Sequence, residues 1–131
     1  MEPTAIEQQV SELVAIASAL PERAISTDDL LRLSSGAIDH DFYNLVALEV
    51  AHKFQAGALS YAICDVIMNG LWAFFLQRCQ NEPEPSPFSE IFEAFDAGEY
   101  YRTADHSDDP VQDHTVPMIE KILSEISRRD E

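Results

Sequence analysis

The chain has 131 residues, with 24 acidic side chains against 8 lysines and arginines, and a formal net charge of -16. A hydrophobic content of 46% at this length supports one domain with a core, so residues 1–131 are expected to form a single unit. The negative charge repels phosphate backbones and anionic lipid, which excludes nucleic acid and membranes as expected ligands and favours a basic partner.

The two cysteines and the first residues favour a cytoplasmic location. Cys64 and Cys79 fall in one predicted helix, roughly 20 Å apart, which is too far for a disulfide bond. Free thiols are typical of a reducing compartment. The stretch MEPTAIEQQ shows no basic region followed by an apolar run and a cleavage site, as an export signal would.

Two helices are predicted in the first third of the chain. The apolar residues of the first recur at spacings of three and four: Ile6, Val10, Leu13, Val14, Ala17 and Leu20. Pro21 marks its end. Ser26 and Thr27, ahead of two aspartates, are typical of an N-cap and predict a short second helix that stops near Gly36.

A third helix is predicted to occupy the centre of the fold. Asp39 or Asp41 can cap it, and Gly57 ends it. Its apolar face is broad and comprises Phe42, Leu45, Val46, Leu48, Val50, Ala51 and Phe54.

The following segment, GALSYAICDVIMNGLWAFFL, has about the length of a membrane span. Asp65 lies near its middle, where a charged residue costs about 3 kcal/mol on membrane insertion, and no cluster of positive charge flanks it. We therefore expect a core helix that runs to about Cys79.

The last third begins with a proline-rich connection, NEPEPSP at 81–87, which interrupts regular structure. A fifth helix is predicted from Phe88 to Phe95, with Gly98 as a left-handed terminator. A loop follows, and then a final helix from Val116 with Pro117 in its first turn. With no alternating strand pattern, the predicted fold is all-α, a bundle of five or six helices.

Two groups of residues in the sequence could ligate a metal, and a third place, Asp65, is a candidate for catalysis. Glu49 and His52 form a single Glu-x-x-His pair, whereas di-iron bundles use two, so a solvated stripe completed by Lys53 is favoured. A second group lacks the spacing of a calcium loop. It comprises His106, Asp108, Asp109, Asp113 and His114. Catalytic motifs are also missing, so neither a metal nor a cofactor is expected.

Asp65 interrupts an otherwise apolar helix. Its helical neighbours Tyr61, Met68, Asn69 and Trp72 form a mixed stripe with hydrogen-bonding capacity. If the carboxyl is buried it needs a partner or a raised pKa, and it becomes a site candidate. If the stripe is the half-exposed edge of a packed helix, no site follows, and this structural interpretation is the one we favour.

The segment 82–113 concentrates acidic and aromatic residues. Its ten acids face one base, Arg102. The acids are Glu82, Glu84, Glu90, Glu93, Asp96, Glu99, Asp105, Asp108, Asp109 and Asp113. The adjacent Tyr100 and Tyr101 add rigid amphipathic rings, the residue type that dominates interface hot spots, while the carboxylates steer a basic partner. The alternative is that one or both rings close the end of the core.

About thirty residues around these tyrosines resemble the small acidic all-helical immunity proteins that neutralise nuclease bacteriocins of the colicin type. That family has an aspartate before a Tyr-Tyr pair and then an acidic turn leading into the final helix. The matching residues are Asp96, Tyr100, Tyr101, Asp108, Asp109 and Pro110. The resemblance implies that Asp96 and the two tyrosines contact a basic toxin domain. In this chain the aspartate lies one residue farther from the tyrosines, Arg102 replaces a proline, and extra N-terminal helices precede the motif.

The sequence thus predicts an acidic, non-enzymatic module that binds a basic protein. The role expected for such a module is that of an immunity or inhibitor protein. The expected contact residues are Asp96, Glu99, Tyr100, Tyr101, Asp108 and Asp109. Two alternatives stay open. One is a small helical enzyme or metal-binding protein that uses Glu49, His52 and Asp65, and the other is a structural homodimer joined around Trp72, Phe74 and Phe75.

Overall fold

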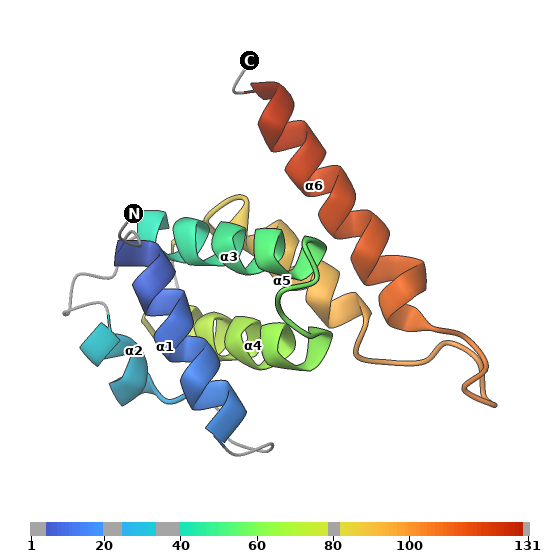
Figure 1. Cartoon of the computed structure of the whole chain (residues 1–131), viewed down its shortest axis with the longest axis horizontal. Helices are drawn as coiled ribbons and strands as arrows, with labels where there is room; N and C mark the ends of the chain where they lie inside the picture. Colours follow the sequence, from blue (N-terminus) through green and yellow to red (C-terminus); the bar gives the residue numbers. More distant parts are fainter. Residues whose placement is uncertain (1–4, 20–24, 34–39, 79–81, 130–131) are drawn as a thin grey trace.

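The computed structural model describes residues 5–19, 25–33, 40–78 and 82–129, and Figure 1 shows their arrangement. Within these ranges the chain is helical, with no strand, which confirms the predicted all-α class. The elements are α1 (Ala5–Ala19), α2 (Thr27–Leu33), α3 (His40–Gln55), α4 (Tyr61–Arg78), α5 (Phe88–Ala97), the π-helical turn η1 (Val111–Thr115) and α6 (Val116–Arg129). The predicted features at Leu20, Pro21, Gly36, Asp39 and Cys79 lie outside the described residues.

The helices pack around one hydrophobic core in which α3, α4 and α5 all contact one another. Helix α1 packs on α3 and α4, α2 packs on α4, and α6 packs on α3 and α5. The central position predicted for α3 is therefore confirmed. Aromatic rings fill much of the core, since Tyr43, Phe74, Phe88 and Phe95 are among its largest fully buried side chains. Buried aromatic rings each remove a large apolar area from water, so they dominate the stability of a small domain.

Helix α2 begins at the N-cap that the sequence predicts. The Ser26 hydroxyl accepts a hydrogen bond from the Asp29 amide at 3.1 Å, and the Asp29 carboxylate accepts one from the Ser26 amide at 3.4 Å. This reciprocal pair satisfies two amides that a helix start leaves without intrahelical partners.

The boundary between α3 and α4 falls at Gly57, as predicted, because its φ of 79° lies in the left-handed region that glycine adopts without strain. Helix α4 then begins at Tyr61 and carries the core residues Cys64 and Ile67. Burial raises the pKa of the Cys64 thiol to about 12, with a further contribution from the negative charge of Asp65. Among the described residues, no helix is both long enough and apolar enough to span a bilayer.

The prediction that Gly98 ends α5 in a left-handed conformation is wrong. Its φ is -85°, in the right-handed region. Glycine is required for space instead, since an added Cβ would collide with the Thr115 hydroxyl and approach the Tyr61 ring to 3.1 Å. At the end of α5, the side chains of Tyr61 from α4 and Thr115 from η1 therefore both lie against the backbone of Gly98.

The final helix starts at Val116, as predicted, but the unpredicted π-helical turn η1 precedes it without a break. The amide of Val116 donates to the carbonyl of Val111, five residues back, which is the bond of a π-helix. Pro117 has no amide hydrogen and its ring crowds the preceding turn of a regular helix. The wider turn directly before Pro117 relieves that crowding and lets one helical segment continue through the proline.

The C-terminal part of helix α6 projects beyond the other helices (Figure 1). Ile119 and Leu123 are buried against the bundle, whereas Arg128 and Arg129 are exposed in its last turn. These two bases lie at the negative end of the helix dipole, where positive charge is favourable.

The crowding at Gly98 gives a stability prediction. Gly98→Ala is expected to lower the free energy of unfolding by about 1–3 kcal/mol, because the new methyl group overpacks the contact with Thr115 and Tyr61. Urea denaturation of the variant measures this loss. Gly57→Asn serves as the control, since nothing lies within 4 Å of a Cβ at Gly57 and asparagine tolerates the left-handed region. Equal stability of Gly98→Ala and the wild type would contradict the prediction.

Candidate functional site

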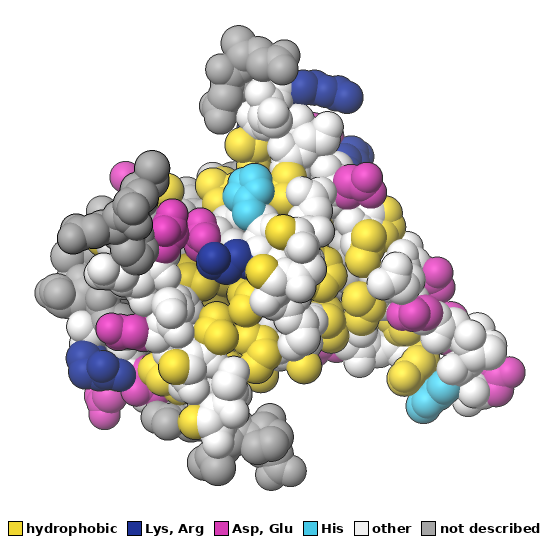
Figure 2. Space-filling view, in the orientation of Figure 1, with side chains coloured by type: hydrophobic (Ala, Val, Ile, Leu, Met, Phe, Trp, Pro, Cys, Tyr) yellow, Lys and Arg dark blue, Asp and Glu magenta, His cyan; other side chains and the backbone are white. Residues whose placement is uncertain are grey.

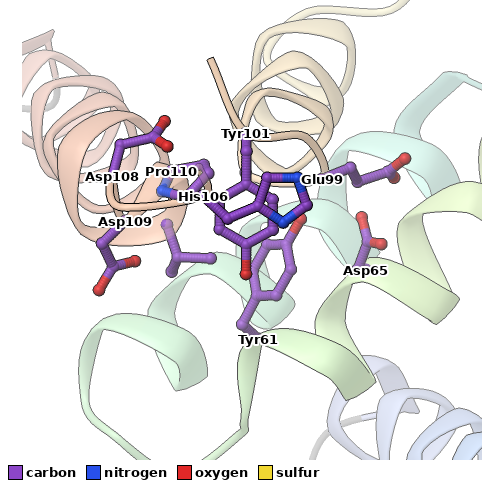
Figure 3. A pocket seen from close by; sticks show the side chains of 10 residues that line it. Tyr61, Asp65, Glu99, Tyr101, His106, Asp108, Asp109 and Pro110 are labelled. Carbon is purple, nitrogen blue, oxygen red and sulfur yellow. The ribbon is translucent and has the colours of Figure 1, made fainter. Parts of the chain in front are cut away.

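A cleft of about 700 Å³ lies between the start of α4, the end of α5 and the loop of residues 98–109. We call it the α4–loop cleft. Figure 3 shows the aromatic rings of Tyr61, Tyr101 and His106 at its centre. The carboxyl groups flank them, with Asp65 and Glu99 on one side of the view and Asp108 and Asp109 on the other.

The side chain of Arg102 is folded back onto its own loop. Its guanidinium donates to the carbonyl of Ala97 at 2.9 Å and to the carbonyl of Tyr100 at 3.1 Å. The same group lies 4.2 Å from the centroid of the Tyr100 ring. The one base of segment 82–113 thus binds the last turn of α5, where free carbonyls and the helix dipole favour a cation.

The carboxylates of Asp105 and Asp108 hold the loop in shape. Asp108 accepts hydrogen bonds from the Arg102 amide at 2.9 Å and from the Thr103 hydroxyl at 2.8 Å. The bond from the Arg102 amide is the main cause that lowers the pKa of Asp108. Hydrogen bonds from Ser107 likewise lower the pKa of Asp105. Both groups therefore keep their negative charge well into mildly acidic conditions.

Tyr101 and His106 form a flat stacked pair within the loop. Their ring centroids lie 4.1 Å apart with an interplanar angle of 6°. His106 has a φ of 57°, a left-handed conformation that histidine adopts more readily than most residues. Asp109 accepts a hydrogen bond from the Gln112 amide at 3.2 Å, which joins the end of the loop to η1. The stack therefore belongs to an ordered wall of the cleft.

The structure exposes five of the six residues that the sequence identifies as contact residues, and it leaves the sixth, Asp108, half-buried. Tyr100 and Tyr101 keep 54% and 50% of their surface accessible, so neither ring closes the core. Asp96 is exposed on the last turn of α5. Glu99 is also exposed, but its carboxylate accepts a hydrogen bond from the Asn69 side chain at 2.9 Å, which ties the loop to α4. The two tyrosines differ in position: Tyr101 lines the cleft, whereas Tyr100 pairs with Arg102.

Asp65 is half-buried and faces the cleft from α4. Its Oδ1 atom is buried and has no hydrogen-bond partner among the described residues. Burial raises the pKa of Asp65 to about 8, with contributions from a hydrogen bond with Glu99 and from the negative charges of Glu99 and Asp96. A hydrogen bond with Asn69 acts in the opposite direction. Near neutral pH the carboxyl group is therefore mostly protonated.

Tyr61 was noted in the sequence only as a helical neighbour of Asp65, yet it joins two elements of the site. Its hydroxyl donates to the carbonyl of Phe95 at 2.6 Å. Burial, followed by the negative charges of Asp65, Glu99 and Asp96, raises the pKa of this phenol far above its ordinary value. It is consequently a neutral donor over the whole working range of pH. The mixed stripe around Asp65 was the only signal for it.

The alternative site around Glu49 and His52 is not assembled. Glu49 forms an ion pair with Lys53 at 3.3 Å, as the solvated-stripe interpretation expects. Within the described ranges, no three histidine, cysteine, aspartate or glutamate residues are grouped so that they could hold a metal ion. The predicted second group, around His106 and His114, therefore also lacks such a cluster among the described residues. Of the three residues suggested for a homodimer contact, Phe74 and Phe75 are buried in the core of this chain and Trp72 is half-buried.

Comparisons with protein-family models, with curated proteins and with solved structures found no match. The role of the site is therefore inferred from its own geometry and chemistry.

The raised pKa of Asp65 predicts how stability depends on pH. Because the folded state binds a proton that the unfolded state loses near pH 3.8, this group contributes stability that declines as pH rises from about 4 to about 8. Asp65→Asn keeps the shape without the titration, so its stability relative to the wild type should increase between about pH 5 and about pH 8.5.

Denaturant unfolding of both proteins at the two pH values measures this difference. Glu93→Gln removes the same single charge from an exposed position on α5 outside the cleft, and it controls for the net charge of the protein. A relative stability of Asp65→Asn that is the same at both pH values would contradict the prediction.

Proposed function

We propose that this chain is a non-enzymatic binding module that captures a basic protein through the 98–109 loop and the adjoining end of α5, and that it acts as an immunity or inhibitor protein. The observation that supports this most strongly is the half-exposure of the Tyr100 and Tyr101 rings within an acidic loop. With Leu45 and Leu76, they are the large hydrophobic side chains that stand out as exposed among the described residues. Exposed aromatic rings in an ordered loop are typical anchors of protein interfaces.

The placement of charge supports the same proposal. Arg102 uses its guanidinium on carbonyls of its own chain, so the neighbouring carboxylates are not neutralised by a free base. Asp96, Asp105 and Asp109 are exposed around the tyrosines. Figure 2 shows acidic side chains beside apolar ones and a histidine at the end of the molecule where Figure 1 places this loop. Such a surface steers a basic protein at long range and then offers rings for close contact.

The order of the loop also favours recognition. Hydrogen bonds of Asp108 to residues 102 and 103, and the stack of Tyr101 on His106, hold the loop before a partner arrives. A binding loop that is already ordered loses little conformational entropy in the complex, which increases affinity. The proposed inhibitory action is then steric: the bound module covers the basic surface with which its partner would contact nucleic acid.

The proposal predicts that the double substitution Tyr100→Ala, Tyr101→Ala leaves folding intact and weakens capture of the basic partner by about 2–4 kcal/mol. The two rings supply contact area, and their half-exposure means that little core packing is lost. Immobilised protein is incubated with host extract at low ionic strength, and the retained proteins are eluted with salt.

The double variant Leu45→Ala, Leu76→Ala is the matched control, because both leucines are 48% exposed outside the acidic loop. A basic protein should be retained by the wild type and by the leucine variant, and lost by the tyrosine variant. Equal retention by all three proteins would refute the proposed role of the tyrosines.

A further inference from the structure

We propose that the α4–loop cleft receives one arginine side chain of the basic partner, whose guanidinium pairs with the carboxyl groups of Asp65 and Glu99 between the rings of Tyr61 and Tyr101. This inference rests on the proposed function and specifies the chemistry of its recognition. The cleft is large enough for such a side chain, with a volume of about 700 Å³.

The first argument is the unmet hydrogen-bonding capacity of Asp65. Its buried Oδ1 lacks a donor in the described part of the chain, although the residue faces a cleft. A buried acceptor without a donor costs free energy, and a ligand recovers it when its binding turns this oxygen toward the cleft. Guanidinium offers five N–H donors in one plane and is the side-chain group best suited to bridge two neighbouring carboxyl groups.

The second argument is the sign of charge in the cleft. Four carboxyl groups line it, from Asp65, Glu99, Asp108 and Asp109, and no lysine or arginine does so. Arg102, the one base of the 98–109 loop, donates to the carbonyls of Ala97 and Tyr100. The polar side chains that a cation meets in the cleft are therefore four carboxyl groups, two phenols and one imidazole, beside the apolar Pro110 and Val111.

The third argument is the shape of the aromatic wall. Tyr101 and His106 present a stack of nearly parallel rings, and the Tyr61 ring lines the same cleft. Flat aromatic faces bind guanidinium more favourably than the compact, strongly hydrated ammonium group of lysine. The loop already shows this contact within the chain, since the Arg102 guanidinium lies 4.2 Å from the Tyr100 ring. The cleft offers a second position of the same kind to an arginine from outside.

Proton linkage supplies a signature of this binding mode. The pKa of Asp65 is raised to about 8 by burial, Glu99 and Asp96, so a guanidinium that pairs with the carboxylate displaces a proton to solvent. The charged or titratable groups that interact with Asp65 are Tyr61 and Cys64 on α4, Asp96 on α5 and Glu99 in the loop. Affinity for arginine should therefore rise as pH increases from about 6 to about 8, and Asp65→Asn should remove the part of this rise that Asp65 causes.

The experiment titrates the full chain with three capped tripeptides, Gly-Arg-Gly, Gly-Lys-Gly and Gly-citrulline-Gly, at low ionic strength. NMR signals of the Tyr61 and Tyr101 rings and of the Gly98 amide report occupancy of the cleft. The arginine peptide should shift these signals, with an affinity about tenfold above that of the lysine peptide, and the uncharged citrulline peptide should not bind. Asp65→Asn should lower arginine affinity about tenfold.

Two controls keep the result interpretable. Glu99→Gln tests the second carboxylate from an exposed position, and Glu93→Gln, which removes an exposed acid outside the cleft, should bind like the wild type. Equal binding of the arginine and lysine peptides, or undiminished arginine binding by Asp65→Asn, would overturn the arginine site. If Asp65→Asn also captures the basic partner as well as the wild type while the tyrosine variant does not, the arginine site is wrong and the proposed function stands.

Discussion

The arrangement of the site depends on one close contact, in which α4 and η1 both bind the last turn of α5. The Tyr61 hydroxyl donates to the carbonyl of Phe95 at 2.6 Å, and the buried Thr115 hydroxyl donates to the carbonyl of Ala94 at 2.7 Å. Gly98 makes this convergence possible because it places no side chain between them. The Phe95 carbonyl also accepts the Gly98 amide at 3.1 Å, so the two hydroxyls add to the backbone bonds that end α5 and position the loop that follows. The cleft exists because these three segments meet there.

The carboxylates of the acidic segment have different structural roles, although their charges look equivalent in the sequence. Asp105, Asp108 and Asp109 accept hydrogen bonds from loop or helix amides and hold the backbone in place. Asp96 differs from these three residues because it lies exposed in the last turn of helix α5 and not in the loop. Hydrogen bonding to an amide leaves a carboxylate charged, so the groups that shape the loop also contribute to its negative potential. Structural and electrostatic roles are thus compatible in the same residues.

Local signals in the sequence were enough to predict the all-α fold, the N-cap at Ser26, the end of α3 at Gly57 and the core position of α4. Each depends on side-chain periodicity or on a backbone preference within a few residues. The role of Gly98 was missed because its neighbours Tyr61 and Thr115 are distant in sequence. The π-helical turn was missed because periodicity does not distinguish it from an ordinary helix start. The acidic segment was recognised as a candidate site from its composition, but the cleft required knowledge that Asp65 and Tyr61 lie opposite the loop.

Asp65 connects these observations, because its burial opposes ionisation at a place that is already strongly negative. Four ionised carboxyl groups around one cleft would repel one another, and protonation of Asp65 reduces that repulsion in the free protein. The loop acids Asp105 and Asp108, whose pKa values are lowered by hydrogen bonds, keep the charge that acts over distance. In the proposed function, exposed carboxylates therefore attract the partner. Near neutral pH, the half-buried carboxyl group of Asp65 becomes charged when a cation occupies the cleft. Long-range attraction and short-range selection are then carried by different residues of one surface.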